Sequence, residues 1–244
     1  MNLSERNRKV AISRWNKILT KEKEMILSNE EGVFLKSAIC GFLAGDGSVQ
    51  KINVGNYTRY QIDFFPDDKV MLKTYVDFIK RVYNKTPTIG RRDNMFTVRI
   101  NSKTIGEDLL NGAKFGLRNW EIPLAMLSNR KLKRCWVRAF FSAEGFVNKK
   151  TIKIQTINQK GMNQLSNLLN KLSIKHKCYL YDSKKKNYSK VYIIRINTKE
   201  ARKKFYYDIG FWHSDKMKTL KKSLLPDLLM PVSHNGIAQA WNIP

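Results

Sequence analysis

Two segments of this chain repeat one pattern, and the repeat restricts the possible folds more than any other feature. Residues 33–47 (VFLKSAICGFLAGDG) and 131–145 (KLKRCWVRAFFSAEG) each carry apolar side chains at helical spacing. Each ends in an acid followed by glycine, at Asp46-Gly47 and Glu144-Gly145. Glycine just past the last turn is the usual left-handed helix stop, so each segment is predicted to be a helix that ends at its acid. Self-similarity of this kind indicates two similar structural units.

The segments after the two helices repeat in the same order. Alternating polarity predicts strands, and helical spacing predicts helices. Each half therefore reads helix, two strands, helix, two strands, helix, which predicts an α+β fold of two pseudo-symmetric αββαββα repeats with antiparallel sheets. In the first half the later elements are predicted at 48–54, 57–65, 67–83, 86–91, 95–101 and 103–114. In the second half they are predicted within 146–158 and at 159–172, 176–181, 189–197 and 199–208.

The net charge of the chain indicates an anionic partner. The sequence has 46 Lys and Arg against 20 Asp and Glu, a formal net charge of +26. Charge of this size repels itself unless a polyanion balances it, and nucleic acid binds basic groups with release of counterions. A ribosomal-type or merely soluble basic protein would share this composition. The charge therefore favours nucleic-acid binding and leaves the activity open.

Several other classes of protein do not fit the sequence. No stretch approaches the roughly 20 apolar residues that span a bilayer, and the N-terminus does not resemble a secretory signal. We therefore expect no membrane partner and no secretion, and a location in the cytoplasm of an archaeal or bacterial host or in an organelle matrix. Cys40, Cys135 and Cys178 form no CxxC pair. They are interpreted as buried thiols of a reducing compartment, neither a disulfide framework nor a zinc site.

The predicted strands have one apolar face and one face rich in Arg, Lys, Gln, Asn and Thr. Such side chains reach bases and phosphates in a DNA major groove, which accepts a β-ribbon. Any half-exposed sheet turns polar residues outward. However, acids are scarce on the polar face of the strands within 57–65, 95–101, 146–158 and 189–197, which favours a DNA-binding saddle. The residues predicted to bind DNA are Arg59, Gln61, Asp63, Arg91, Arg99, Asn101, Lys153, Gln155, Arg195 and Asn197.

The paired acids indicate a metal site. Gly41 and Ala139 occupy equivalent positions in the two helices, and such small residues let helices approach closely. If the two helices pack in parallel, Asp46 and Glu144 meet at helix ends that already carry negative partial charge. Like charges so placed are costly unless a cation relieves them. Oxygen ligands of this kind suit Mg²⁺. For each acid alone, an ordinary helix-end carboxylate is the simpler interpretation, and their matched occurrence argues against it.

The nonapeptides ICGFLAGDG (39–47) and VRAFFSAEG (137–145) are similar to the motif that names the LAGLIDADG family. The eighth position is acidic in both copies, whereas the sixth, often acidic in the family, is Ala44 and Ser142. Residues 120–123 and 209–211 also resemble family segments, and the likeness covers roughly Gly32 to Leu225. The implied organisation is an extension at 1–29, repeats at 30–129 and 130–230, and a tail at 231–244. The basic residues of the extension predict a helix that either follows flanking DNA phosphates or caps the first half.

The resemblance implies a monomeric, single-chain homing endonuclease with two central parallel motif helices. Such an enzyme would hydrolyse one phosphodiester in each strand of double-stranded DNA, across the minor groove of a long asymmetric site, and leave short 3′ overhangs. The implied cofactor is Mg²⁺, as two or three ions, with Mn²⁺ able to substitute and Ca²⁺ binding without cleavage. The implied metal ligands are Asp46, Glu144, Gly45 and Ala143. The implied catalytic residues are Asp46, Glu144, Lys216, Arg118 and Gln155, although in so basic a chain the last three could equally be phosphate contacts.

Two other functions are compatible with the same fold. An intron maturase would use the basic surface to bind intron RNA, with or without cleavage. A DNA-binding regulator would keep the fold with a decayed site. Retention of both Asp46 and Glu144 favours catalysis, because a protein that only binds nucleic acid has little use for a clustered negative charge.

Overall fold

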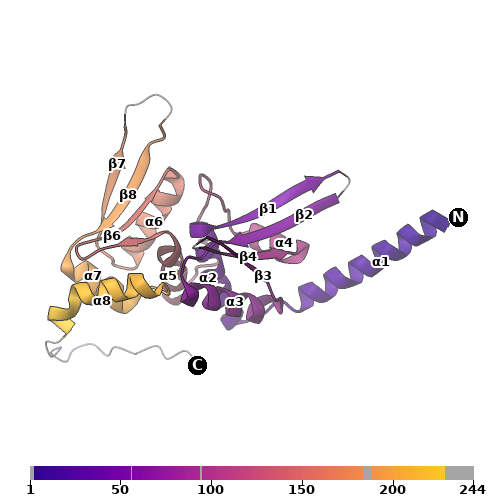
Figure 1. The fold of residues 1–244 in the computed structure, drawn as a ribbon, viewed down its shortest axis with the longest axis horizontal. Coiled ribbons are helices and arrows are strands. Elements are labelled where there is room, and N and C mark those ends of the chain that lie inside the picture. The colour runs from indigo at the N-terminus through magenta and orange to yellow at the C-terminus, as the bar shows by residue number, and fades with distance from the viewer. Residues whose placement is uncertain (1–2, 56, 94, 184–187, 229–244) are drawn as a thin grey trace.

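The chain folds into two similar α+β halves around a central pair of helices. The computed structural model describes residues 3–55, 57–93, 95–183 and 188–228. Figure 1 shows the halves side by side, with their sheets splayed outward from α2 (Glu30–Asp46) and α5 (Arg130–Glu144). The predicted order of helix, two strands, helix, two strands, helix is confirmed in both halves.

Each half contains one four-stranded antiparallel sheet of the same topology. The first half continues from α2 with β1 (Gly47–Val54), β2 (Tyr57–Phe64), α3 (Lys69–Tyr83), β3 (Thr88–Arg92), β4 (Met95–Asn101) and α4 (Lys103–Gly112). The second continues from α5 with β5 (Phe146–Val147), β6 (Ile152–Thr156), α6 (Gln159–Lys171), β7 (Lys177–Tyr181), β8 (Val191–Ile196) and α7 (Lys199–Asp208). The strand orders, β1-β2-β4-β3 and β5-β6-β8-β7, correspond element by element.

The two motif helices begin in the same way. Asn29 and Asn129 precede α2 and α5, and each side chain accepts a hydrogen bond of 2.9 Å from a backbone N–H of the first turn, at Gly32 and Leu132. Such an N-cap satisfies one of the backbone donors that a helix start leaves unpaired. α2 therefore begins at Glu30 and α5 at Arg130, directly after these two asparagines.

The two motif helices end at Asp46 and Glu144, as predicted, but the backbone conformation of the glycine that follows each acid was predicted wrongly. A left-handed stop was expected at the glycines, but Gly47 (φ −135°, ψ 178°) and Gly145 (φ −72°, ψ 135°) are both extended. Glycine is required at these positions by space. A Cβ at Gly47 would lie 2.7 Å from the Leu43 Cα, and one at Gly145 would lie 2.3 Å from the Phe141 carbonyl oxygen.

One face of each sheet packs on helices and forms a continuous core with α2 and α5. Ile62 and Phe64 of β2 are fully buried, as are Ile154 of β6 and Ile194 of β8. Their neighbours along each strand point to the opposite face, as the alternation predicted. Of the three cysteines, Cys40 and Cys135 are buried. The expectation for Cys178 is wrong, because this thiol lies exposed on β7, whose five residues are all exposed.

Two helices lie outside the repeat pattern. α1 (Leu3–Glu24) projects from the first half (Figure 1) and is attached at its last turn, where Glu22 pairs with Lys85 (3.1 Å) and accepts a hydrogen bond from Ser102. α8 (Ser214–Leu228), which the sequence did not predict as an element, packs on α7 and β5. The tail at 231–244 lies outside the described residues. In the part of the chain that the structure describes, no helix has the length and apolarity to cross a bilayer.

Candidate catalytic centre

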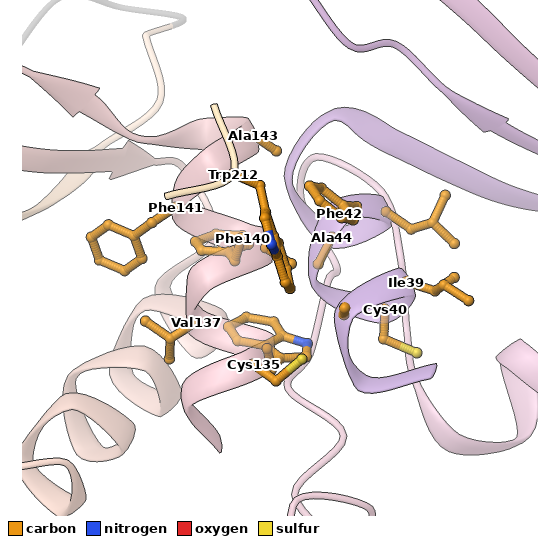
Figure 2. Packing of buried hydrophobic residues seen from close by; sticks show 14 of the residues in the cluster. Ile39, Cys40, Phe42, Ala44, Cys135, Val137, Phe140, Phe141, Ala143 and Trp212 are labelled. Carbon is orange, nitrogen blue, oxygen red and sulfur yellow. The ribbon is translucent and has the colours of Figure 1, made fainter. Parts of the chain in front are cut away.

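The central helices touch through their smallest residues. A Cβ added to Gly41 would lie 2.5 Å from the Trp136 carbonyl oxygen and 2.7 Å from the Ala139 Cβ. One turn later, a Cβ on Gly45 would lie 2.6 Å from the Ala143 Cβ. Because later residues of α2 meet later residues of α5, the helices run parallel, as the family resemblance implied. Figure 2 shows them side by side, with α5 rising from Cys135 toward Ala143.

Parallel packing brings Asp46 and Glu144 together at the ends of α2 and α5. Burial, together with the nearby charge of Asp46, raises the pKa of Glu144 from 4.5 to about 7. Burial also raises the pKa of Asp46, with a contribution from Asp67. Within the described residues neither carboxylate makes a hydrogen bond or an ion pair. Both stand at helix C-termini, where the backbone dipole disfavours negative charge.

Lys216, in the first turn of α8, lies at this pair of acids. Its Nζ donates hydrogen bonds to the carbonyl oxygens of Ser142 (2.7 Å) and Ala143 (2.6 Å) in the last turn of α5. Its positive charge lowers the pKa of both Asp46 and Glu144, against the effect of burial. Burial lowers the pKa of Lys216 itself, while the surrounding carboxylates raise it.

A second cluster beside Asp46 has no counterpart among the predicted site residues. Asp67 and Asp68 follow β2, and they meet His213 and Ser214 of the other half, at the start of α8. His213 Nε2 lies 3.4 Å from Asp67 Oδ1, and Ser214 donates hydrogen bonds to Asp68 through its backbone N–H (3.3 Å) and its hydroxyl group. In the sequence, Asp67-Asp68 resembles an ordinary helix start. Only its position after β2, the second strand that follows the motif helix α2, could have indicated that it lies near the acids.

Trp212 fixes this connection between the two halves. Its ring lies 5.3 Å from Phe42 and 5.5 Å from Phe78 of the first half, centroid to centroid. The Arg138 guanidinium lies 4.8 Å from the centre of the ring, and the Trp212 backbone N–H donates a 2.7 Å hydrogen bond to Ser142 Oγ. Figure 2 shows the ring between the two central helices, so aromatic packing at Trp212 joins the two halves.

The other predicted site residues are exposed or already engaged in contacts within the protein. Arg118 is exposed in the loop after α4, and Gln155 is exposed on β6. Gly45 and Ala143 touch each other, but the Ala143 carbonyl oxygen already accepts a hydrogen bond from Lys216. The residues that the structure describes contain no group of three or more His, Cys, Asp or Glu side chains with metal-binding geometry.

The ten residues predicted to bind DNA are distributed over both sheets. On the first sheet, Arg59, Gln61, Asp63, Arg99 and Asn101 form a hydrogen-bonded network, in which Asp63 is buried. Arg91 donates to the Asp93 carbonyl oxygen (3.3 Å) and packs on Phe96. On the second sheet, Lys153 packs on Phe146, Arg195 packs on Tyr179, and Asn197 accepts from Thr151.

The pair of acids fits a divalent cation. Both are oxygen donors, as Mg²⁺, Mn²⁺ and Ca²⁺ prefer. They are partly desolvated and repel each other, and a single ammonium group, that of Lys216, only partly balances them. A cation between them would relieve the repulsion that raises the pKa of Glu144.

Comparison with known proteins gives a family match over part of the chain and a fold match over most of it. Residues 131–210 match the model of the LAGLIDADG-like domain. A structure of mesophilic variants of the homing endonuclease I-DmoI matches with a TM-score of 0.60 and 20% identity, over 72% of this chain and 90% of that chain. I-DmoI in complex with DNA and Mn matches with a TM-score of 0.59 and 19% identity, over 72% and 96%. The homing endonuclease I-WcaI bound to its DNA recognition sequence matches with a TM-score of 0.52 and 16% identity, over 85% and 92%. No curated protein matches this sequence.

Proposed function

We propose that this chain, which carries a LAGLIDADG-like domain and has the fold of the single-chain homing endonucleases, cuts double-stranded DNA at one long asymmetric site. The observation that carries the proposal is the pair Asp46 and Glu144, whose charge Lys216 balances only in part. The two acids are held at the ends of two parallel helices, between two sheets with basic polar faces. Such a pair costs stability, and a strongly basic protein has a use for it only as a metal site at a phosphate.

Asp46 and Glu144 would hold the ions, with Gly45 and Ala143 as further candidates. When bound, divalent metal supplies charge stabilisation at the scissile phosphate and an activated water. Structures of I-DmoI with DNA contain Mn, Ca or Mg in different complexes. We propose Mg²⁺ for this chain, with Mn²⁺ as a substitute and Ca²⁺ as a non-productive ligand.

The protein's own groups prepare the site in three ways. Close packing at Gly41 and Gly45 fixes the separation of the two acids, because neither helix can move without opening the interface. Lys216 balances part of their charge and is itself held by the end of α5. Phe42 and Trp212 pack against each other between the central helices and keep that part of the interface apolar.

The proposal is tested by cleavage of a plasmid pool of intron-junction and random sequences in Mg²⁺. Wild type is compared with Asp46→Asn and Glu144→Gln, and with Asp77→Asn, which removes a surface acid that is 57% exposed on α3. Discrete double-strand cuts by wild type and Asp77→Asn, with none by the other two variants, would support the nuclease and its metal ligands. Tight binding of intron RNA, with no sequence cut by any form, would favour the maturase instead.

A further inference from the structure

The exposed polar faces of the two sheets differ in their internal bonding. The first face, formed by Arg59, Gln61, Asp63, Arg99 and Asn101, is a connected network. Arg59 donates to Asn101 (3.0 Å) and Gln61 (2.9 Å), Gln61 donates to Asp63 (2.6 Å), and Arg99 Nε donates to Asp63 (2.7 Å). The Asp63 carboxylate thus compensates part of the charge of Arg99 and is linked to Arg59 through Gln61, so that each side chain is held in one orientation.

Such a network suits the reading of base edges. Guanidinium and amide groups pair with purine edges in the major groove only when their orientation is fixed, because bidentate contacts need two bonds at once. The partial compensation by Asp63 lowers the attraction of this face for phosphate. Asp63 is only 4% exposed, so the acceptor of the bonds from Arg99 and Gln61 is buried.

The second face has the opposite character. Lys153, Arg195 and Lys177 lie side by side on β6, β8 and β7, because Lys153 pairs with Arg195 and Lys177 also pairs with Arg195 in the strand register. Like charges directly opposite on neighbouring strands destabilise a sheet. Among the described residues, no carboxylate lies within ion-pair distance of these three side chains. Lys153 instead lies over the Phe146 ring (5.1 Å), and Arg195 lies over the Tyr179 ring (5.2 Å).

The row of charges continues into a basic hollow at the end of the second face. The hollow is lined by Lys150, Thr151, Arg195, Asn197 and Arg202. Arg202 is only 8% exposed, and its Nη1 donates hydrogen bonds to the Lys149 carbonyl oxygen (2.9 Å) and to Ser223 Oγ (2.8 Å). Its buried Nε has no hydrogen-bond partner among the described residues. A fixed, incompletely paired guanidinium beside two further cations suits a phosphate group.

We infer that the two faces divide the work of recognition: the first face reads bases, and the second face holds the DNA through its phosphates. The inference rests on the proposed binding of duplex DNA. It assigns sequence specificity mainly to the half-site under the first sheet. It assigns the salt-dependent part of the affinity mainly to the cationic row Lys153, Arg195 and Lys177.

Two variants that each remove one positive charge test the division, Arg59→Gln and Lys177→Gln. Each is compared with wild type by selection from a pool of randomised duplex DNA and by titration of one mixed-sequence duplex at several salt concentrations. We expect Lys177→Gln to recover the wild-type sequence and to make the slope of log K against log salt shallower by about 1. We expect Arg59→Gln to change the recovered bases in one half-site with a smaller change in slope. The double variant Lys153→Gln/Lys177→Gln should make the slope shallower by about 2.

The outcomes separate this inference from the proposed function. If Lys177→Gln alters the recovered bases while Arg59→Gln leaves them unchanged, the division is wrong although the protein binds DNA. Equal sequence information in the two half-sites would also overturn it. If wild type retains no duplex, or retains only an intron RNA hairpin, the proposed function fails first and the inference with it. Thermal melting of each variant shows whether a loss of binding is a loss of folding.

Discussion

The substitution Glu144→Gln is expected to stabilise the metal-free protein at pH 8 while it abolishes cleavage. Burial and the Asp46 charge raise the pKa of Glu144 from 4.5 to about 7 in the folded protein. A carboxyl group with a raised folded-state pKa takes up a proton on folding, so its contribution to stability is fully present below the unfolded pKa. That contribution is lost as the pH rises through about 7. Glutamine carries no charge and escapes this loss.

The size of the effect follows from the two pKa values. One pKa unit corresponds to about 1.4 kcal/mol, so the interval from 4.5 to about 7 corresponds to about 3.5 kcal/mol as an upper value. Some water reaches the site, and about 2 kcal/mol is a reasonable expectation at pH 8. For a chain of this length such a gain raises the Tm by roughly 4–8 °C. Near pH 4 the two proteins should melt together.

The assay is thermal melting in EDTA across pH 4–9, with Asp77→Asn as the surface control. Addition of Mg²⁺ at pH 8 should raise the Tm of wild type and leave that of Glu144→Gln nearly unchanged, because a ligand stabilises only the state that binds it. A Glu144→Gln protein that is less stable than wild type at pH 8 would refute the reasoning. A gain of the same size at pH 4 would show that packing, rather than charge, is responsible.

Three further substitutions, the first of them with a matched control, test the packing around the site. Gly41→Ala should lower the free energy of unfolding by about 2 kcal/mol, because the new methyl group meets the α5 backbone. The control Gly112→Ala should raise it slightly, because among the described residues only the Met126 Cε lies near the new methyl group, at 3.7 Å. Urea denaturation of both variants measures the two changes. Trp212→Ala should cost about 3–5 kcal/mol by the same measurement, since the ring joins the two halves. Lys216→Met should cost about 1 kcal/mol through the lost bonds to α5 and should slow cleavage strongly, and near-normal cleavage would remove Lys216 from the catalytic residues.

Most of the fold was predictable because it depends on local patterns. Helical spacing and strand alternation are set by neighbouring residues, and the repeat doubled the evidence for each element. The acids were predictable for the same reason, since parallel packing of two equivalent helices places their ends together. Gly41 and Ala139 carried that inference, and they do lie in contact.

The remaining parts depend on contacts between distant residues. Asp68 and Ser214 are joined across 146 positions, and nothing near either residue indicates the other. The glycines after the motif helices were identified correctly but for the wrong reason. Left-handed geometry is a local rule, whereas Gly145 is needed because the Phe141 carbonyl oxygen lies where a side chain would begin. Cys178 was expected to be buried, but all five residues of β7 are exposed.

The structure also shows that the two halves of the site are not equivalent. The α5 end is capped by Lys216, whose ammonium group binds two of its last carbonyl oxygens. The corresponding basic residue of the first half, Arg118, lies exposed in a loop. The pKa of Asp46 is instead shifted by the charges of Lys216, Asp67 and His213. A strict two-fold site would place the same charges around both acids. Here one lysine serves both acids from one side, so the two strands of a bound duplex would meet different electrostatic surroundings. An asymmetric centre of this kind is consistent with two sheets whose polar faces also differ.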